Sequence, residues 1–214
     1  LPQLGAPGIS GFLVTKQSGF KVVYGPVRAS DIKNFLDAGM KATDAMRVVR
    51  FTLRDRIVLT PIEFVGGLKT LLFIFGILFV LTATGFGHYG LIDLYAFLGA
   101  VVGGTVLAPV LLPWIPGRAF SFKGFFLGFL WAVGVALING IPVGSLSGWL
   151  KVAACFMLLP ALSAFYAMNF TGSSTYTSLS GVDKEMRIAL PIMIISSGIG
   201  VILLLTGDLI QRFI

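Results

Sequence analysis

Apolar residues follow two different patterns along the chain. From residue 61 onward, long apolar stretches succeed one another, each near the length of about 20 residues that crosses a bilayer. Before residue 61, short apolar runs alternate with polar ones. The pattern predicts a mainly α-helical, integral membrane domain over residues 61–214, preceded by a smaller region over residues 1–60. The five predicted transmembrane helices cover residues 61–84, 91–112, 122–141, 150–168 and 188–210.

Local signals mark the ends of two of these helices. Thr60 as N-cap, Pro61 at the first helical position and Glu63 at the third predict the start of the first helix. Three prolines crowd the end of the second helix and predict a kinked or broken exit there: Pro109, Pro113 and Pro116.

The N-terminal region mixes strand and helix signals. Residues 19–24 are typical of a short buried strand that ends at Gly25-Pro26, and residues 49–53 of a short edge strand. Residues 9–18 favour a short helix, and Ser30 and Gly39 are typical of the N-cap and C-cap of another. A parallel strand needs neighbours that residues 1–60 do not encode. We therefore interpret this region as the C-terminal remnant of an α/β domain, joined by a basic connector to the membrane.

Composition and charge agree with a membrane location. The chain is 56% hydrophobic and 12% charged, against roughly 25% charged residues in soluble domains. The net charge is +7, and nine of the 16 Lys and Arg residues lie between positions 16 and 56. The positive-inside rule then predicts a cytoplasmic (inner) membrane protein with a cytoplasmic N-terminal region and an external C-terminus. No basic surface interleaved with aromatic residues indicates nucleic-acid binding.

Few side chains can carry metal or proton chemistry. The single cysteine, Cys155, and the single histidine, His88, exclude a disulfide framework and a conventional Cys or His metal cluster. Asp93, Lys151 and Asp208 fall near helix ends, so no charge is expected in mid-membrane. Their placement argues against a proton-coupled pump and leaves a facilitator for a neutral solute possible.

Two small-residue patterns predict close helix contacts. Glycines spaced by four residues at Gly99–Gly103 and at Gly124–Gly128 let neighbouring helices approach closely. We interpret both as packing signals, because a phosphate-binding loop would need a lysine and a preceding strand that are absent here.

A hydroxyl-rich segment, residues 169–181, follows the fourth predicted helix. Ser180 with Asp183 is typical of the cap of a new helix. A flexible polar loop and an ordered segment that meets a ligand or the N-terminal region both fit this composition. We predict an ordered segment that packs beneath the soluble domain.

Three stretches together resemble the HgcA family, the corrinoid membrane proteins of anaerobic mercury methylation: "LPQLGAPG", "GFKVVYGPVRASDIKNFLDAGMKAT" and "NFTGSSTYTSLSGV". The resemblance implies a corrinoid-binding α/β domain, similar to that of the corrinoid iron–sulfur proteins of acetyl-CoA synthesis, followed by five transmembrane helices. It also implies that two loops contact the corrinoid (cobalamin), while ordinary tight turns remain the alternative explanation of their glycines. The implied cofactor-binding residues are Gln3, Leu4, Gly5, Ala6, Pro7, Gly8, Gly25, Pro26, Val27 and Arg28.

The same resemblance implies an enzyme, a corrinoid-dependent methyltransferase that passes a methyl group from cobalt to Hg(II). The implied partners are a ferredoxin with two [4Fe–4S] clusters and a methyl donor protein. The family motif Asn-(Val/Ile)-Trp-Cys-Ala-Ala-Gly-Lys, whose cysteine ligates cobalt, is absent from this chain. No catalytic or metal-ligating residue is therefore assigned, and the chain is expected to be part of a longer protein. Alone, it is not expected to bind corrinoid or methylate mercury.

Two other functions fit the same residues. One is a small membrane transporter or channel with a cytoplasmic stub, and the other is a paralogue with the same membrane domain and no mercury chemistry. The helices themselves could anchor the soluble domain, dock the ferredoxin or pass mercury inward. A Trp-Cys-Ala-Ala-Gly motif in an upstream coding sequence would favour the methyltransferase.

Overall fold

The computed structural model describes residues 1–85, 87, 89–140, 144–174 and 179–213. The chain divides into two compact units, Leu1–Arg50 and Phe51–Ile214. The predicted domain boundary after residue 60 falls inside a long helix, α4 (Leu53–Ala83). All regular elements in the described ranges are helical, and no strand is found there.

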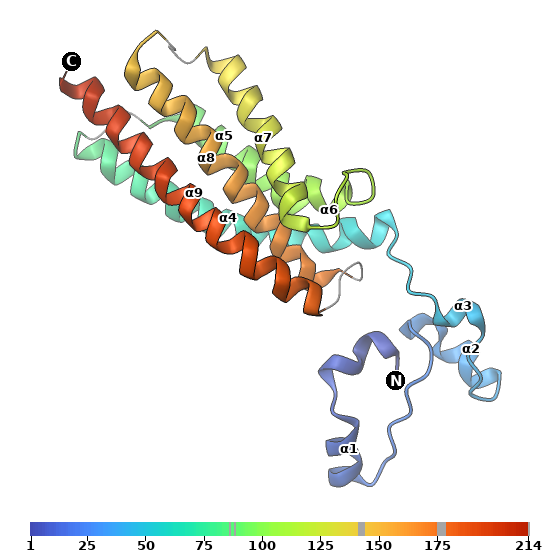
Figure 1. The fold of residues 1–214 in the computed structure, drawn as a ribbon. Helices are drawn as coiled ribbons and strands as arrows, with labels where there is room; N and C mark the ends of the chain where they lie inside the picture. The colour runs from blue at the N-terminus through green and yellow to red at the C-terminus, as the bar shows by residue number, and fades with distance from the viewer. Residues whose placement is uncertain (86, 88, 141–143, 175–178, 214) are drawn as a thin grey trace. The chain divides into compact units, whose positions relative to one another are not determined.

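The first unit consists of short helices joined by extended chain (Figure 1). The predicted helix over residues 9–18 is confirmed as α1, with the Ser10 hydroxyl accepting the Leu13 N–H at 3.4 Å and Gly19 at the C-cap. The elements of this unit are η1 (Gln3–Gly8), α1 (Gly11–Ser18), η2 (Ala29–Asp31), α2 (Ile32–Asp37) and α3 (Asp44–Arg47).

The helix predicted near Ser30 and Gly39 is α2, and one of its two caps differs from the prediction. Ser30 lies inside the η2 turn, where its hydroxyl donates to Asp31 at 3.4 Å, so it is not the N-cap. At the other end Gly39, with φ of 65°, terminates the helix as predicted. The N–H of Met40 donates to the Phe35 carbonyl at 2.9 Å, which completes a Schellman-type ending.

The two predicted strands are wrong, and residues 1–60 contain no α/β remnant. Residues 19–24 are extended chain without a strand partner, and residues 48–52 form the irregular approach to α4. A strand needs a neighbouring chain to take its backbone hydrogen bonds. Among the described residues, the start of the chain offers two such bonds: the Leu1 ammonium donates to the Val23 carbonyl at 2.8 Å, and the Gly25 N–H donates to the Leu1 carbonyl at 2.9 Å. Phe20 bonds instead to side chains of α1.

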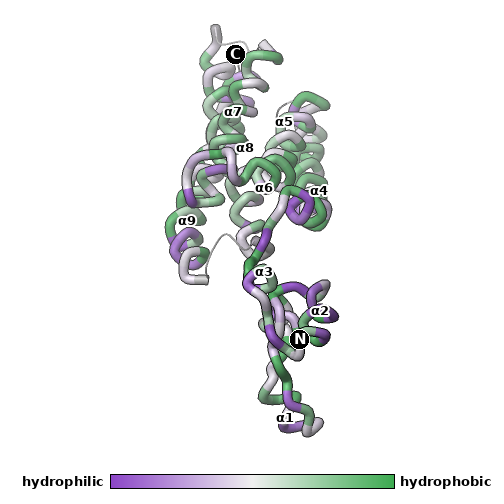
Figure 2. Tube along the Cα trace, turned by 90° about the vertical axis from the view of Figure 1, so that its right-hand side faces the viewer, coloured by the Kyte–Doolittle hydropathy of each residue, from purple (hydrophilic) through white to green (hydrophobic). Residues whose placement is uncertain are grey.

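The second unit is a bundle of helical membrane spans (Figure 1). Five helical segments in the described ranges are long and apolar enough to cross a membrane, which confirms the five predicted helices. Figure 2 shows apolar colouring along most of their length. They are α4 (Leu53–Ala83), the composite of α5 (Leu91–Val102), η3 (Gly103–Leu107) and α6 (Ala108–Val110), α7 (Phe120–Asn139), α8 (Leu146–Asn169) with η4 (Phe170–Ser173), and α9 (Leu179–Phe213).

The first long helix begins earlier than predicted. Thr52 is the N-cap of α4 and forms a reciprocal capping box with Asp55. Pro61 therefore lies inside the helix, where it lacks the N–H that would bond to the Ile57 carbonyl. The hydroxyl of Thr60 donates to that carbonyl at 2.9 Å instead, which explains how the helix tolerates the proline.

The predicted break near the end of the second span is confirmed. Its last turns form a π-helical stretch, η3, in which the N–H of Ala108 donates to the Gly103 carbonyl five residues earlier. Pro109 lies in the short helix α6 that follows, where it has no N–H to offer to the Thr105 carbonyl. The chain then leaves the helix after Val110.

Close packing at the predicted glycines is also observed. A Cβ on Gly124 would lie 2.5 Å from the Ser163 carbonyl oxygen, and one on Gly128 would lie 2.7 Å from the Pro160 Cα. Helix α7 therefore contacts the α8 backbone directly. A Cβ on Gly99 would overlap the ring of Trp131, and one on Gly103 would lie 3.2 Å from the Ser163 hydroxyl.

Candidate functional site

The two loops implied to bind a corrinoid lie side by side in the first unit. The N–H of Gln3 donates to the Pro26 carbonyl at 2.9 Å, and the N–H of Leu4 donates to the Val27 carbonyl at 3.3 Å. The side-chain amide of Gln3 donates to the Gly25 carbonyl at 3.1 Å, across 22 residues of sequence. The residue pattern alone did not predict this contact, which requires the chain to fold back on itself.

The two loops differ in what they present. In the first, the residues Gln3, Leu4, Gly5 and Gly8 are exposed. In the second, three consecutive residues, 25–27, are buried, and the side chains of Pro26 and Val27 lie in the interior of the unit. Arg28 turns its guanidinium to the Arg50 carbonyl at 2.5 Å. The carbonyls of Pro26 and Val27 are taken by the N–H groups of Gln3 and Leu4, so the first loop is the part that a ligand could reach.

Glycine occurs at these loop positions for different structural reasons. A Cβ on Gly25 would lie 2.9 Å from the Phe35 ring, so packing within the unit already requires glycine there. A Cβ on Gly5 would meet only Pro2, at 3.7 Å, and one on Gly8 would meet nothing within 4 Å. Internal packing thus explains Gly25, whereas the open space at Gly5 and Gly8 is where another group could approach.

A hollow of about 410 Å³ opens beside these loops. Gln3 and Gly25 lie on one side of it, and Phe35 and Met40 from the end of α2 also line it. Arg47, from the last turn of α3, adds a cation to the lining. The hollow therefore combines backbone, an amide, apolar surface and one positive charge.

The hydroxyl-rich segment is ordered over its first part. Phe170 is fully buried in a cluster with Leu112 and Phe120, and Thr171 is 6% exposed. Residues 175–178 lie outside the described residues. Helix α9 begins at Leu179, so Ser180 is inside the first turn and the predicted cap there is wrong. Asp183 instead forms an ion pair with Arg187 at 3.0 Å.

The lone cysteine lies inside the bundle, and the lone histidine, His88, lies outside the described residues. Cys155 packs against a cluster that includes Ala96, Ala132 and Leu159. A small cavity of about 30 Å³ adjoins it, with Tyr89 and Asp93 in the lining. No group of three or more His, Cys, Asp or Glu side chains that could hold a metal ion occurs in the described part of the chain.

A polar network joins the ends of three elements where α9 finishes. Asp208 is 4% exposed and pairs with Lys151 of α8 at 3.1 Å. Lys151 also donates to Gln211 at 2.7 Å, and the Tyr89 hydroxyl donates to Asp208. Burial, the hydrogen bond to Asp208 and the nearby carboxylate charges raise the pKa of Tyr89, so its phenol stays a donor at neutral pH. The sequence placed these charges at helix ends but did not show that they meet.

A buried arginine satisfies the carbonyls at the broken exit of the second span. Arg56, in the first turns of α4, is 4% exposed and donates to the Pro109 carbonyl at 3.3 Å and to the Val110 carbonyl at 2.6 Å. Pro113 has no N–H to donate to Pro109, so that carbonyl needs another donor. The closely spaced prolines were the sequence signal that such a donor would be required.

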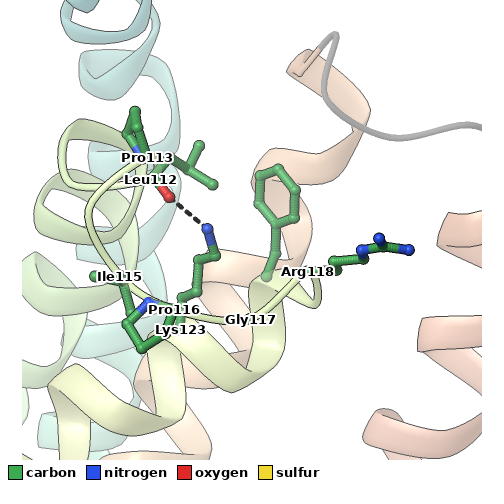
Figure 3. Close-up of a pocket in the computed structure, with 8 residues that line it drawn as sticks. Leu112, Pro113, Ile115, Pro116, Gly117, Arg118 and Lys123 are labelled. Atoms are coloured by element: carbon green, nitrogen blue, oxygen red, sulfur yellow. Dashed lines mark hydrogen bonds between the residues drawn. The ribbon is translucent and has the colours of Figure 1, made fainter.

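A buried lysine donates to another unpaired carbonyl of the same exit, that of Leu112. Lys123 of α7 is 7% exposed, and its ammonium donates to the Leu112 carbonyl, as Figure 3 shows. Pro116 lacks the N–H that a continuing helix would offer to that carbonyl. Beside this contact lies a hollow of about 500 Å³, formed by the loop from Pro113 to Arg118.

Comparisons with protein-family models, curated proteins and solved structures find no match to this chain.

Proposed function

We propose that this chain is the C-terminal portion of a membrane-anchored corrinoid methyltransferase that transfers a methyl group to Hg(II). The observation that carries the proposal is the contact between the two loops of the resemblance. Gln3 and Leu4 bond to the backbone of Pro26 and Val27, so both stretches border one hollow. Ligand sites are typically concave, and this hollow offers the Gln3 amide and the Arg47 guanidinium beside the Phe35 ring.

The first unit fits one side of a corrinoid and leaves its cobalt without a protein ligand. The exposed Gln3 and Leu4, with open space at Gly5 and Gly8, would face the macrocycle. The Gln3 side-chain oxygen would accept from its amide side groups, and the Leu4 side chain would supply apolar contact. Leu1–Arg50 contains no cysteine, so the cobalt ligand would have to come from elsewhere in the protein. When bound, the corrinoid supplies the methyl-transfer chemistry. The residues of this chain would hold and orient it at the membrane.

The remaining roles follow from that assignment. A small ferredoxin with two [4Fe–4S] clusters would return the cofactor to its reduced state, a methyl donor protein would reload it, and Hg(II) would be the acceptor. The five membrane helices would keep this exchange at the bilayer. Residues 169–174, which pack at the end of the bundle, are the part of the hydroxyl-rich segment we assign to the cytoplasmic face.

Bulk at Gly8 tests the proposed corrinoid contact. In a protein that carries this chain together with its upstream domain, Gly8→Trp should weaken cobalamin binding about tenfold or more, because the indole would occupy open space that a ligand needs. Visible absorption of the purified protein measures retained corrinoid. Gln17→Trp, on the exposed surface of α1, is the matched control and should bind normally. Equal retention by both variants would remove this loop from the site.

Cysteine labelling tests the proposed orientation. In a Cys155→Ala background, a cysteine at Gly144 should react with an impermeant thiol reagent added outside intact cells, and one at Gly172 should not. A Cβ at either position meets nothing within 4 Å, so neither substitution should disturb packing. The basic residues near the N-terminal unit predict that side to be cytoplasmic. The reverse labelling pattern would place the first unit outside.

A further inference from the structure

The hollow at the exit of the second span is bordered by cations that form no ion pair among the described residues. Lys123 lies in its wall and Arg118 on its rim, with Leu112 and Phe120 as apolar lining. Figure 3 shows the Lys123 ammonium turned toward the Leu112 carbonyl and the Arg118 side chain directed away from it. The hollow thus has one buried and one exposed cation.

A second buried cation lies at the same exit. Arg56 is 4% exposed, its Nε has no hydrogen-bond partner, and its guanidinium lies 5.7 Å from the Trp114 ring centre. In the described part of the chain, neither Arg56 nor Lys123 forms an ion pair with a carboxylate. Two carboxylates near these cations are used by backbone N–H groups: Glu185 accepts the Ser121 N–H at 2.6 Å, and Asp55, next to Arg56, accepts the Thr52 N–H at 2.8 Å.

Buried charges are expensive unless an opposite charge accompanies them. Backbone carbonyls solvate the two cations only in part, because each ammonium or guanidinium has more N–H donors than the bonds found here. Lys123 lines the hollow of about 500 Å³, and Arg56 bonds to carbonyls of the same helix exit, so the two buried positive charges favour an anion in that hollow.

The depth of the site in the membrane indicates which anion is available to bind there. Trp114 is 65% exposed, and tryptophans of this kind are typical of the level of lipid headgroups. Arg56 and Lys123 lie in the first turns of α4 and α7, where those spans begin. The hollow therefore opens at the membrane surface, where phosphate groups of lipids are the most concentrated anions.

We propose that this hollow binds the phosphate group of an anionic membrane lipid. The Lys123 ammonium is the positive partner inside the hollow, and Arg56 adds its field from the neighbouring helix. The Arg118 side chain is exposed at the rim and would turn its guanidinium back to meet the phosphate. The apolar lining from Leu112, Ile115 and Phe120 contacts the start of the lipid chains. Lipid bound here would fix the irregular loop between the second and third spans.

Removing the charge of Lys123 tests the site. The protein is placed in nanodiscs of phosphatidylcholine alone, or with added phosphatidylglycerol, and its thermal unfolding midpoint and the lipids retained in native mass spectra are measured. The anionic lipid should raise the midpoint of the wild-type protein by several degrees. Lys123→Gln, which keeps an N–H donor for the Leu112 carbonyl, should weaken retention of the anionic lipid about tenfold.

Two further variants keep the test decisive. Arg118→Gln changes an exposed side chain, so it should fold normally and still lose part of the midpoint shift. Lys184→Gln removes an equal charge from an exposed position of α9 and should keep the full shift. An equal shift in all variants would overturn the proposal. If inorganic phosphate in phosphatidylcholine nanodiscs reproduces the shift, the site takes a free anion and the lipid assignment is wrong.

Discussion

Adding a single methyl group at Gly128 should destabilise the membrane unit severely. The new Cβ would lie 2.7 Å from the Pro160 Cα and 2.9 Å from the Leu159 carbonyl oxygen, and backbone atoms cannot move aside as a flexible side chain can. Gly128→Ala should therefore lower the free energy of unfolding by about 3 kcal/mol, at the upper end of overpacking costs. Unfolding by denaturant in detergent micelles measures the change.

The same helix offers a matched control. A Cβ on Gly134 would meet nothing within 4 Å, so Gly134→Ala should stay within about 0.5 kcal/mol of the wild type. The comparison separates steric contact between α7 and α8 from the general effect of replacing a glycine in a helix. If the two alanine variants are equally stable, the close approach of these helices is not a source of stability.

The sequence predicted these glycine contacts only in part. The four-residue spacing at Gly124 and Gly128 indicated that some helix would approach α7 closely. Which helix it is depends on tertiary packing, since Ser163 and Pro160 of α8 carry no signal that marks them as the partner. The number of spans was predictable for a simpler reason: their length and apolarity are set by the bilayer itself.

Helix starts were less predictable because two good signals competed. Thr60, Pro61 and Glu63 form a plausible start, but Thr52 and Asp55 form a reciprocal capping box earlier in the chain. The earlier start prevails because the Thr60 hydroxyl bonds to the carbonyl that Pro61 leaves free. A proline therefore did not prove to be a boundary here.

The strand predictions failed where a partner chain was needed. Residues 19–24 have strand composition, and the start of the chain offers them only a few backbone bonds, among them that from the Leu1 ammonium to Val23. Propensity alone does not make a strand without a neighbour. The loops of the candidate site were identified through resemblance, whereas their mutual contact through Gln3 and Pro26 is a property of the folded chain.

A second large effect on stability is expected from breaking the Lys151–Asp208 pair at the end of α9. Lys151→Met should lower the free energy of unfolding by about 3 kcal/mol, since it leaves the Asp208 carboxylate buried without its cation. Asp208→Asn should cost only about 1 kcal/mol, because the group that then loses its partner is the better-solvated Lys151 ammonium. The side chain of Asp208 is 2% exposed and that of Lys151 is 31% exposed, so the lysine can turn to water and keep its bond to Gln211.

The asymmetry between these two variants is the informative measurement. In Asp208→Asn, the side-chain amide oxygen would still accept the Tyr89 hydroxyl, so the loop before α5 should keep its contact with α9. In the double variant, the uncompensated carboxylate is gone, and most of the loss caused by Lys151→Met should be recovered. Denaturant unfolding of the two single variants and the double variant completes the cycle. Equal losses in the single variants would contradict the asymmetry, and additive losses in the double variant would show that the pair contributes little to the bundle.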